Sequence, residues 1–243
     1  MDHLSELLNV TPQRSRCESG DDLSCPEYPW LAILNHELRT PLNAIAGFAD
    51  LLVTTEDADE KQRYARIIEE NSHWLKQEID DVLELLKLET GNCVNIYTEV
   101  NLFGFLYEKM CIAKKQLVDS KVEVILDVSD TSATVSTDIY YFSLIFNHLI
   151  ENAIKFTQKG CIRLGYQLME KEFRFYVSDT GCGIPQKYHP DIFDCFVKLD
   201  QYVPGLGIGL TICRMIVKQL GGEIGVDSEP EKGSLFWFTL PVK

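Results

Sequence analysis

The sequence lacks long hydrophobic runs and an excess of basic residues. No apolar stretch approaches the roughly 18 residues of a membrane span, and the N-terminus shows no basic-then-apolar signal pattern. Lys and Arg number 23 against 37 Asp and Glu, which gives a net charge of -14. Because such a chain repels phosphate backbones and anionic lipid, binding to nucleic acid or to a membrane surface is disfavoured.

The eight cysteines lack the spacing of a metal or redox site. None forms a CxxC pair, and no histidine cluster completes a zinc pattern. Most fall inside apolar patterns, where a free cysteine behaves as a small buried hydrophobe. Together with the missing secretion signal, this usage indicates a reduced, cytoplasmic protein.

What is present is a globular composition, 45% apolar and 25% charged, over 243 residues. The pattern of apolar and polar residues changes twice along the chain. Residues 1–28 are polar and irregular and predict a linker or a partly disordered segment. Residues 29–91 carry two helical patterns, at 30–53 and 59–88, whereas residues 92–243 alternate strand and helix patterns.

Each of the two helical patterns has an apolar stripe. The stripe of the second helix comprises Tyr64, Ile67, Ile68, Leu75, Ile79, Val82 and Leu86. Gly91 is a natural left-handed cap for its end, and the short loop between the helices predicts an antiparallel hairpin. Since one hairpin cannot bury two stripes, we expect pairing with a second copy as a homodimeric four-helix bundle.

The second region predicts an α+β fold. Strand patterns lie at 93–100, 121–128, 161–168, 172–179, 222–228 and 234–240, and helical patterns lie at about 101–117, 138–156 and 207–220. We expect one mixed sheet covered on one face by helices.

The first helix contains a defect in the stretch "HELRTPL". Pro41 interrupts the apolar stripe, at a cost of about 3 kcal/mol, and leaves the carbonyl of Glu37 without its helical donor. This defect follows His36 by little more than one turn. A lone histidine on a helix surface is more often solvated than functional, so this stretch carries no assignment by itself.

Two stretches of the second region have an ordinary and a functional interpretation. "HLIENAIKF" places His148, Asn152 and Lys155 on one helix face, which is typical of a solvated face but could offer an Asn oxygen to Mg²⁺. "SDTGCGIP" ends a strand pattern with Asp179 and two glycines. This stretch could be an ordinary Asp-Gly turn. With equal weight, it could be a ligand site in which the Asp179 carboxylate accepts a hydrogen bond from a flat, amine-bearing ring that the glycines allow to approach.

A third stretch, "GLGIGL", opens a helical pattern with Gly205, Gly207 and Gly209. Backbone N–H groups at such a helix start can face an anion, although glycine triplets are common in flexible loops. The roughly 20 residues before it are long for a connection and favour a functional lid.

Taken in order, HExxTP, the Asn-containing helix, DxGxG, the pair Phe193 and Phe196, and GxGxG resemble the transmitter core of two-component sensor histidine kinases. The resemblance runs from about Pro29 to Pro241. It implies a HisKA-type hairpin at 29–91 for dimerisation and histidine phosphotransfer. It also implies an α/β sandwich of the Bergerat type at 92–243, the ATP-binding domain shared with gyrase- and Hsp90-type ATPases.

On this resemblance, the catalytic residues are His36, Glu37 and Thr40. His36 is the phosphoacceptor, and Glu37 accepts the other ring N–H and fixes the tautomer. Thr40 lies on the same face and would orient water for dephosphorylation. Pro41 bends the helix and lets the nucleotide domain approach His36.

The resemblance also implies a site for ATP and Mg²⁺. Asn152 would hold the metal, Asp179 would recognise the adenine amino group, and Lys198 would reach the γ-phosphate. The implied ATP-binding residues are His148, Asn152, Lys155, Phe156, Asp179, Gly181, Gly183, Ile184, Lys198, Gly205, Leu206, Gly207, Gly209 and Leu210.

Two positions depart from the family pattern. His148 stands where Asn is usual, and Cys195 stands where Arg is common between the two Phe positions. An unperturbed imidazole titrates near pH ~6.5, so His148 predicts a site that responds to pH between about 6 and 7.5.

The expected function is an ATP-dependent protein-histidine kinase. It would phosphorylate His36 and pass the phosphoryl group to an Asp of a separate response regulator, which it could also dephosphorylate. Two alternatives remain open. A non-catalytic nucleotide-binding scaffold is compatible with Cys195, and an ATP-driven clamp of the gyrase or Hsp90 type would need a carboxylate where His148 stands.

Overall fold

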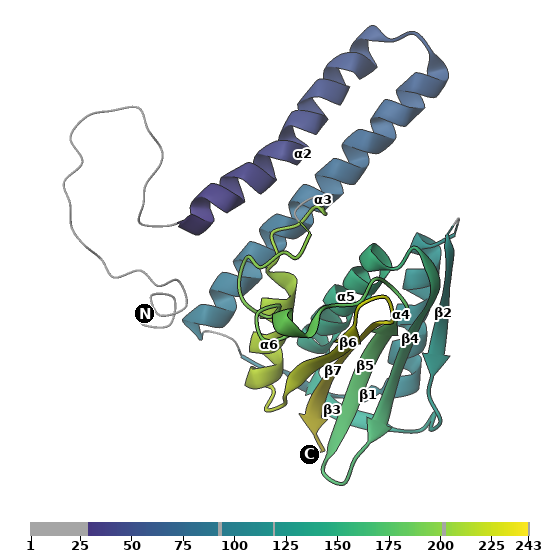
Figure 1. Cartoon of the computed structure of the whole chain (residues 1–243), viewed down its shortest axis with the longest axis vertical. Coiled ribbons are helices and arrows are strands. Elements are labelled where there is room, and N and C mark those ends of the chain that lie inside the picture. Colours follow the sequence, from purple (N-terminus) through teal and green to yellow (C-terminus); the bar gives the residue numbers. More distant parts are fainter. Residues whose placement is uncertain (1–28, 92–93, 119, 201–202, 243) are drawn as a thin grey trace, which may run out of the picture. The chain divides into compact units, whose positions relative to one another are not determined.

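The computed structural model describes residues 29–91, 94–118, 120–200 and 203–242 (Figure 1). The prediction for residues 1–28 lies outside these ranges. The chain divides into two compact units. The first comprises Met1–Asn92 and Phe196–Ile208, and the second comprises Cys93–Cys195 and Gly209–Lys243.

The hairpin of the first unit consists of α2 (Pro29–Thr54) and α3 (Ala58–Thr90), which confirms the predicted pair of helices. Asp57 caps α3, because its side chain accepts hydrogen bonds from the backbone N–H groups of Asp59 and Glu60. Gly91 ends the helix in the left-handed conformation, at a φ of 67°. The helix α2 continues through Pro41, whose side chain is buried.

The predicted stripe of α3 is not buried within one chain. The buried leucines of this helix are Leu85 and Leu88, which the predicted stripe did not include. Two members of the stripe, Ile79 and Leu86, are 44% and 45% exposed, and the nearby Leu83 is 50% exposed. These three recur at i, i+4 and i+7, so they share one face of the helix. The hairpin therefore carries an apolar face that its own two helices do not bury.

The second unit is built on a five-stranded mixed sheet in the order β2-β4-β5-β7-β6. Its elements are β1 (Tyr97–Asn101), α4 (Leu102–Gln116), β2 (Lys121–Asp127), β3 (Thr134–Asp138), α5 (Ile139–Phe156), β4 (Lys159–Leu168), β5 (Glu172–Asp179), the 3₁₀ turn η1 (Gln186–Tyr188), α6 (Gly209–Gln219), β6 (Ile224–Glu229) and β7 (Gly233–Pro241). The strand β2 runs parallel to β4, and the other neighbours are antiparallel.

One part of the predicted sheet was wrong. The strand β1 does not join the main sheet but pairs antiparallel with β3 in a separate two-stranded sheet, with Val100 opposite Val135. The sequence of β3, "TVSTD", is short and mostly polar, so it has little of the alternation that marked the other strands.

The core of the second unit is aromatic. Phe142 and Phe146 lie one turn apart on α5, and Phe175 and Phe238 face them from β5 and β7; all four are fully buried. The ring centroids of Phe142 and Phe175 are 5.0 Å apart, and those of Phe146 and Phe238 are 5.4 Å apart. Burial alternates along β5, which places its apolar side chains on the helix-covered face (Figure 1).

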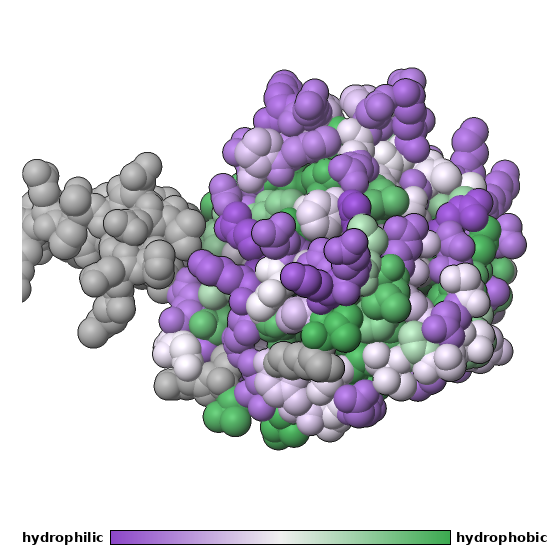
Figure 2. Space-filling model, turned by 90° about the horizontal axis from the view of Figure 1, so that it is seen from below, coloured by the Kyte–Doolittle hydropathy of each residue, from purple (hydrophilic) through white to green (hydrophobic). Residues whose placement is uncertain are grey.

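The surface of the protein mixes hydrophilic and hydrophobic side chains, as the face in Figure 2 shows. In the second unit, large apolar side chains that are exposed include Tyr107, Val118, Tyr140 and Leu168. Among the described residues, no helix combines the length and the hydropathy required to cross a membrane.

Candidate functional site

The helix α5 carries the first group of predicted site residues. Asp138 caps its start by accepting hydrogen bonds from the N–H groups of Tyr140 and Tyr141. Its apolar face is held by the aromatic core, so the position of Asn152 around the helix axis is fixed by packing. Asn152 is half-buried, and its amide has no hydrogen-bond partner among the described residues.

The second group lies where β5 ends. Asp179 is buried, and its Oδ1 accepts a hydrogen bond of 2.8 Å from the N–H of Gly181. Burial raises the pKa of the Asp179 carboxyl, against the opposing effect of the N–H groups of Gly181 and Ser234. Gly181 packs against the carbonyl oxygen of Phe156, so this turn lies beside the C-terminal end of α5.

Gly183 and Ile184 continue this turn toward β6. Gly183 has a φ of 68°, and a Cβ atom there would overlap the carbonyl oxygen of Glu229. Both the backbone conformation and the close approach therefore require glycine. The N–H of Ile184 donates to Ser228 Oγ at 2.8 Å, which fixes the backbone after the glycines.

His148 lies inside the second unit rather than on a solvated face. It is 5% exposed, and a Cβ atom on Gly209 would lie 3.0 Å from its Nδ1, so the start of α6 packs on the ring. Burial lowers the pKa of His148 from 6.5 to about 4. The predicted titration between pH 6 and 7.5 was therefore wrong, because desolvation keeps the imidazole neutral in that range.

Lys155 and Phe156 end α5, and both are exposed. The ammonium of Lys155 lies 5.9 Å from the ring centroid of Phe156. Leu210, in the first turn of α6, is half-buried.

The predicted phosphoacceptor lies on the hairpin. The side chain of His36 is 80% exposed, and its Nδ1 is 3.6 Å from Glu37 Oε1. The hydroxyl of Thr40 donates to the carbonyl of His36 at 3.3 Å, so in this conformation it points along the helix backbone.

The segment 196–208 belongs to the hairpin unit. Lys198 Nζ lies 3.1 Å from Glu37 Oε2, and the N–H of Leu206 donates to Glu78 Oε2 at 3.1 Å. The ring of Phe196 stacks on Trp30, with centroids 6.0 Å apart.

The predicted site residues are thus divided between the units. The first unit brings Glu37 and Lys198 together. The second unit brings His148 against Gly209, and it brings Gly181 against both Asp179 and Phe156. The first unit holds His36, Glu37, Thr40, Lys198, Gly205, Leu206 and Gly207, and the second holds the other predicted residues.

Three residues that the sequence analysis missed also shape these regions. Glu78 is 8% exposed although it is charged, and it interrupts the apolar spacing of α3, which is a signal that could have identified it. Thr211 Oγ1 donates to the carbonyl of Phe193, and Arg214 pairs with Asp194 at 2.8 Å. These two contacts anchor the residues before Phe196 to α6.

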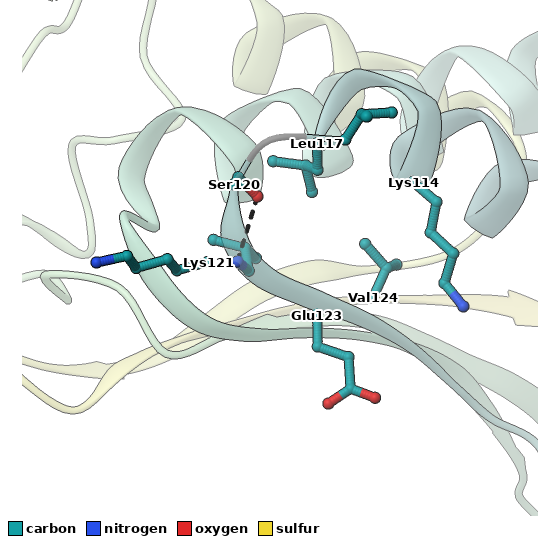
Figure 3. A pocket seen from close by; sticks show the side chains of 8 residues that line it. Lys114, Leu117, Ser120, Lys121, Glu123 and Val124 are labelled. Atoms are coloured by element: carbon teal, nitrogen blue, oxygen red, sulfur yellow. Dashed lines mark hydrogen bonds between the residues drawn. The ribbon is translucent and has the colours of Figure 1, made fainter.

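A separate hollow lies between the end of α4 and β2 (Figure 3). Lys114 and Lys121 line it, but their ammonium groups point away from each other, and Ser120 Oγ accepts a hydrogen bond from the N–H of Val122. None of the predicted site residues lines it. Its polar groups do not converge on a common point, so we assign it no function.

Two family models match the chain. Residues 30–91 match the His Kinase A (phospho-acceptor) domain, and residues 137–243 match the histidine kinase-, DNA gyrase B-, and HSP90-like ATPase domain. The chain therefore contains the transmitter core of the sensor histidine kinases, a phospho-acceptor domain followed by an ATPase domain. It is 34% identical to the sensor protein GacS of Pseudomonas syringae pv. syringae over 97% of this chain and 27% of GacS. It is 33% identical to the signal transduction histidine-protein kinase BarA of Escherichia coli K12 over 87% of this chain and 24% of BarA.

Solved structures agree with this family. The full-length ShkA structure in complex with AMPPNP is 31% identical, with a TM-score of 0.69, over 87% of this chain and 45% of ShkA. The histidine kinase ThkA in complex with the response regulator protein TrrA is 25% identical, with a TM-score of 0.70, over 88% of this chain and 61% of that chain. The chain spans about a quarter of the length of the curated relatives that it matches.

Proposed function

We propose that this chain is an ATP-dependent protein-histidine kinase that autophosphorylates His36. The observation that carries the proposal is the exposed imidazole of His36 beside the carboxylate of Glu37, in a chain that also has the ATPase domain of the family. Nδ1 is the ring nitrogen that faces Glu37. Nε2 is therefore left with its lone pair directed away from the carboxylate and available as the nucleophile.

The residues of the second unit fit an adenine nucleotide. The carboxylate of Asp179 faces the N–H groups of Gly181 and Ser234 and has further lone pairs that can accept from an exocyclic amine. Gly181 brings the backbone close to this carboxylate without a side chain that would block a flat ring, and Gly183 lets the chain after it pass close to the backbone of Glu229. AMPPNP is bound by the related ShkA, which supports ATP as the nucleotide here.

The residues present also fit Mg²⁺ as a partner of the nucleotide. Among the described residues, no group of three or more His, Cys, Asp or Glu side chains could hold a metal ion by itself. Mg²⁺ typically takes one or two protein oxygens together with substrate phosphates and water. The amide oxygen of Asn152 is available for this role. Bound there, Mg²⁺ would supply neutralisation of the charge on the phosphates.

The reaction then requires little covalent chemistry from the protein. His36 Nε2 forms a bond to the γ-phosphorus, the bond from that phosphorus to the β,γ-bridging oxygen breaks, and ADP leaves with the electron pair. The positive charge that develops on the imidazole is stabilised at Nδ1–H by the carboxylate of Glu37. Lys198 would reach the γ-phosphate, and the glycine segment with Leu206 would contact the phosphates. The residues His148, Lys155, Phe156, Ile184 and Leu210 would position the rest of the nucleotide.

The proposal extends to the partners of the chain. A second copy would cover the exposed face of Ile79, Leu83 and Leu86 in a four-helix bundle, and a response regulator would receive the phosphoryl group on an Asp. The complex of ThkA with TrrA supports a response regulator as partner. We place the reaction in the cytoplasm, with residues 29–91 as the phosphotransfer hairpin and 92–243 as the catalytic domain.

Incubation with γ-labelled ATP and Mg²⁺ tests this function. We expect label in the parent protein and none in His36→Gln, with equal thermal unfolding because the side chain is exposed. The label should survive alkali and be lost in acid, as a phosphoramidate does. Label that persists in His36→Gln would end the assignment. ATP binding without any label would instead favour the nucleotide-binding scaffold.

A further inference from the structure

Two carboxylates of the hairpin contact the groups of segment 196–208 that the proposed function reserves for phosphate. Glu37 Oε2 accepts from Lys198 Nζ, and Glu78 Oε2 accepts from the N–H of Leu206, each at 3.1 Å. The side chains of Lys198 and Glu37 are 16% and 19% exposed, and Glu78 is 8% exposed. These are therefore partly desolvated, charge-assisted hydrogen bonds rather than loose surface pairs.

The backbone around Leu206 is shaped to present its N–H to an anion. Gly205 and Gly207 flank it with φ angles of 133° and 73°, which favour glycine. In this conformation the N–H of Leu206 reaches a carboxylate oxygen of Glu78, as a backbone N–H reaches a bound anion. The carbonyl of Gly207 accepts from the N–H of Phe196, which closes the base of the segment.

A carboxylate and a phosphate group compete for the same donors. Both present anionic oxygens that accept from an ammonium or a backbone N–H. A lysine held by Glu37, or an N–H held by Glu78, is not available to a triphosphate at the same time.

We propose that Glu37 and Glu78 act as phosphate mimics that lock segment 196–208 onto the hairpin and thereby compete with ATP. This inference rests on the proposed function. When the hydrogen bonds to the two carboxylates break, Lys198 and the N–H of Leu206 become available to the nucleotide. When the nucleotide leaves, the segment can bind the hairpin again. Glu37 would thus lose Lys198 from Oε2 when the nucleotide binds and keep the imidazole of His36 beside Oε1.

Nucleotide affinity of the whole chain tests the lock. Calorimetric titration with ATP should give a Kd roughly 10-fold lower for Glu78→Ala than for the parent, with Glu78→Gln between them, because a charge-assisted hydrogen bond no longer opposes binding. Glu70→Gln is the matched control, since it removes an exposed carboxylate eight residues earlier on the same helix and should leave Kd unchanged. Thermal unfolding would verify that each variant is folded.

A second variant distinguishes competition with phosphate from a general change in the fold, because it should change the affinity for ATP but not for ADP. Glu37→Gln frees Lys198, which the proposed function places at the γ-phosphate, so affinity for ATP should rise while affinity for ADP stays unchanged. Equal Kd values for ATP in the parent, both Glu78 variants and Glu37→Gln would overturn the lock, as would weaker binding in the Glu78 variants. If no protein, including the parent, binds ATP, the proposed function fails and this inference fails with it.

Discussion

The two units bury their apolar side chains to very different extents. In the second unit, Phe142, Phe146, Phe175 and Phe238 are fully buried against one another. Among the described hairpin residues, the large apolar side chains that are buried are Leu85 and Leu88, and each is still 8% exposed. The second unit therefore completes its own core, whereas the hairpin leaves an apolar face for another surface. A self-contained core suits a binding scaffold, and an open face suits a module that works by association.

The largest effect is expected when an aromatic ring is removed from the core of the second unit. Phe175→Ala should lower the free energy of unfolding of the second unit by about 3 to 5 kcal/mol, because neighbouring rings cannot collapse into the cavity. Urea unfolding measures the loss. Leu168→Ala, a 63% exposed position on the neighbouring strand β4, should change it by less than about 0.5 kcal/mol. Similar losses in the two variants would contradict a core centred on Phe175.

The next prediction concerns the binding groups that this core positions. Asp179→Asn should weaken ATP binding by roughly 10- to 100-fold, since an amide places a donor where the adenine amine needs an acceptor. The amide oxygen can still accept from Gly181, so the turn should remain and thermal unfolding should be unchanged. Calorimetry with ATP checks the affinity. An unchanged Kd would remove Asp179 from the adenine site.

Acid should reveal the buried imidazole of the second unit. The pKa of His148 is about 4 in the folded state and near 6.5 when exposed, so the unfolded chain binds more protons between these values. Stability is therefore lost as pH falls, by about 2 kcal/mol between pH 7.5 and 5, and His148→Asn should remove that part of the loss. Chemical unfolding of both proteins at the two pH values measures the difference.

Two further readings follow from the same pKa. The difference between variant and parent is the relevant quantity, because every other ionisable group of the chain is the same in both proteins. Between pH 6 and 7.5, the kinase profiles of parent and His148→Asn should differ in height but not in shape. An equal loss of stability in both proteins at pH 5 would show that His148 is not desolvated.

The smallest effect is expected on the open face of the hairpin. Leu83 is 50% exposed, and burying the rest of such a side chain contributes about 1 kcal/mol per copy. Leu83→Ala should weaken a dimer by roughly 10-fold or more, since two copies lose the contact. Sedimentation at several concentrations measures this change, with the exposed Lys76→Ala as control. A concentration-independent monomer in the parent would show that this face has another use.

Periodic patterns allowed much of the fold to be predicted. Both hairpin helices, six strands and the three long helices of the second unit lie where their 3.6- and 2-residue periods indicated. The strand β3 was not predicted because its five residues are mostly polar. Its pairing with β1 depends on contacts between distant segments, which local patterns do not encode.

The candidate site was predictable in its residue types but not in its environment. The motifs identified Asp179 and the glycines, yet the desolvation of His148 arises from packing against Gly209, which is remote in sequence. The pairs that Glu37 and Glu78 form with segment 196–208 likewise join residues more than 100 positions apart. A single sequence contains no signal for such pairs except that Glu78 falls at a position where the spacing favours an apolar side chain.

The segment 196–208 has one more property. Both of its ends are covalently joined to the second unit, at Cys195 and Gly209, while its contacts place it with the first. Glu37 and Glu78 therefore bind the segment within the same chain. Their effective concentration is set by the geometry of the chain and does not fall when the protein is diluted. Self-association obeys the opposite rule, because it weakens with every dilution. A dilution series would thus distinguish the two kinds of contact. The fraction of dimer would fall on dilution, and the fraction of molecules in which Glu37 and Glu78 hold the segment would stay constant.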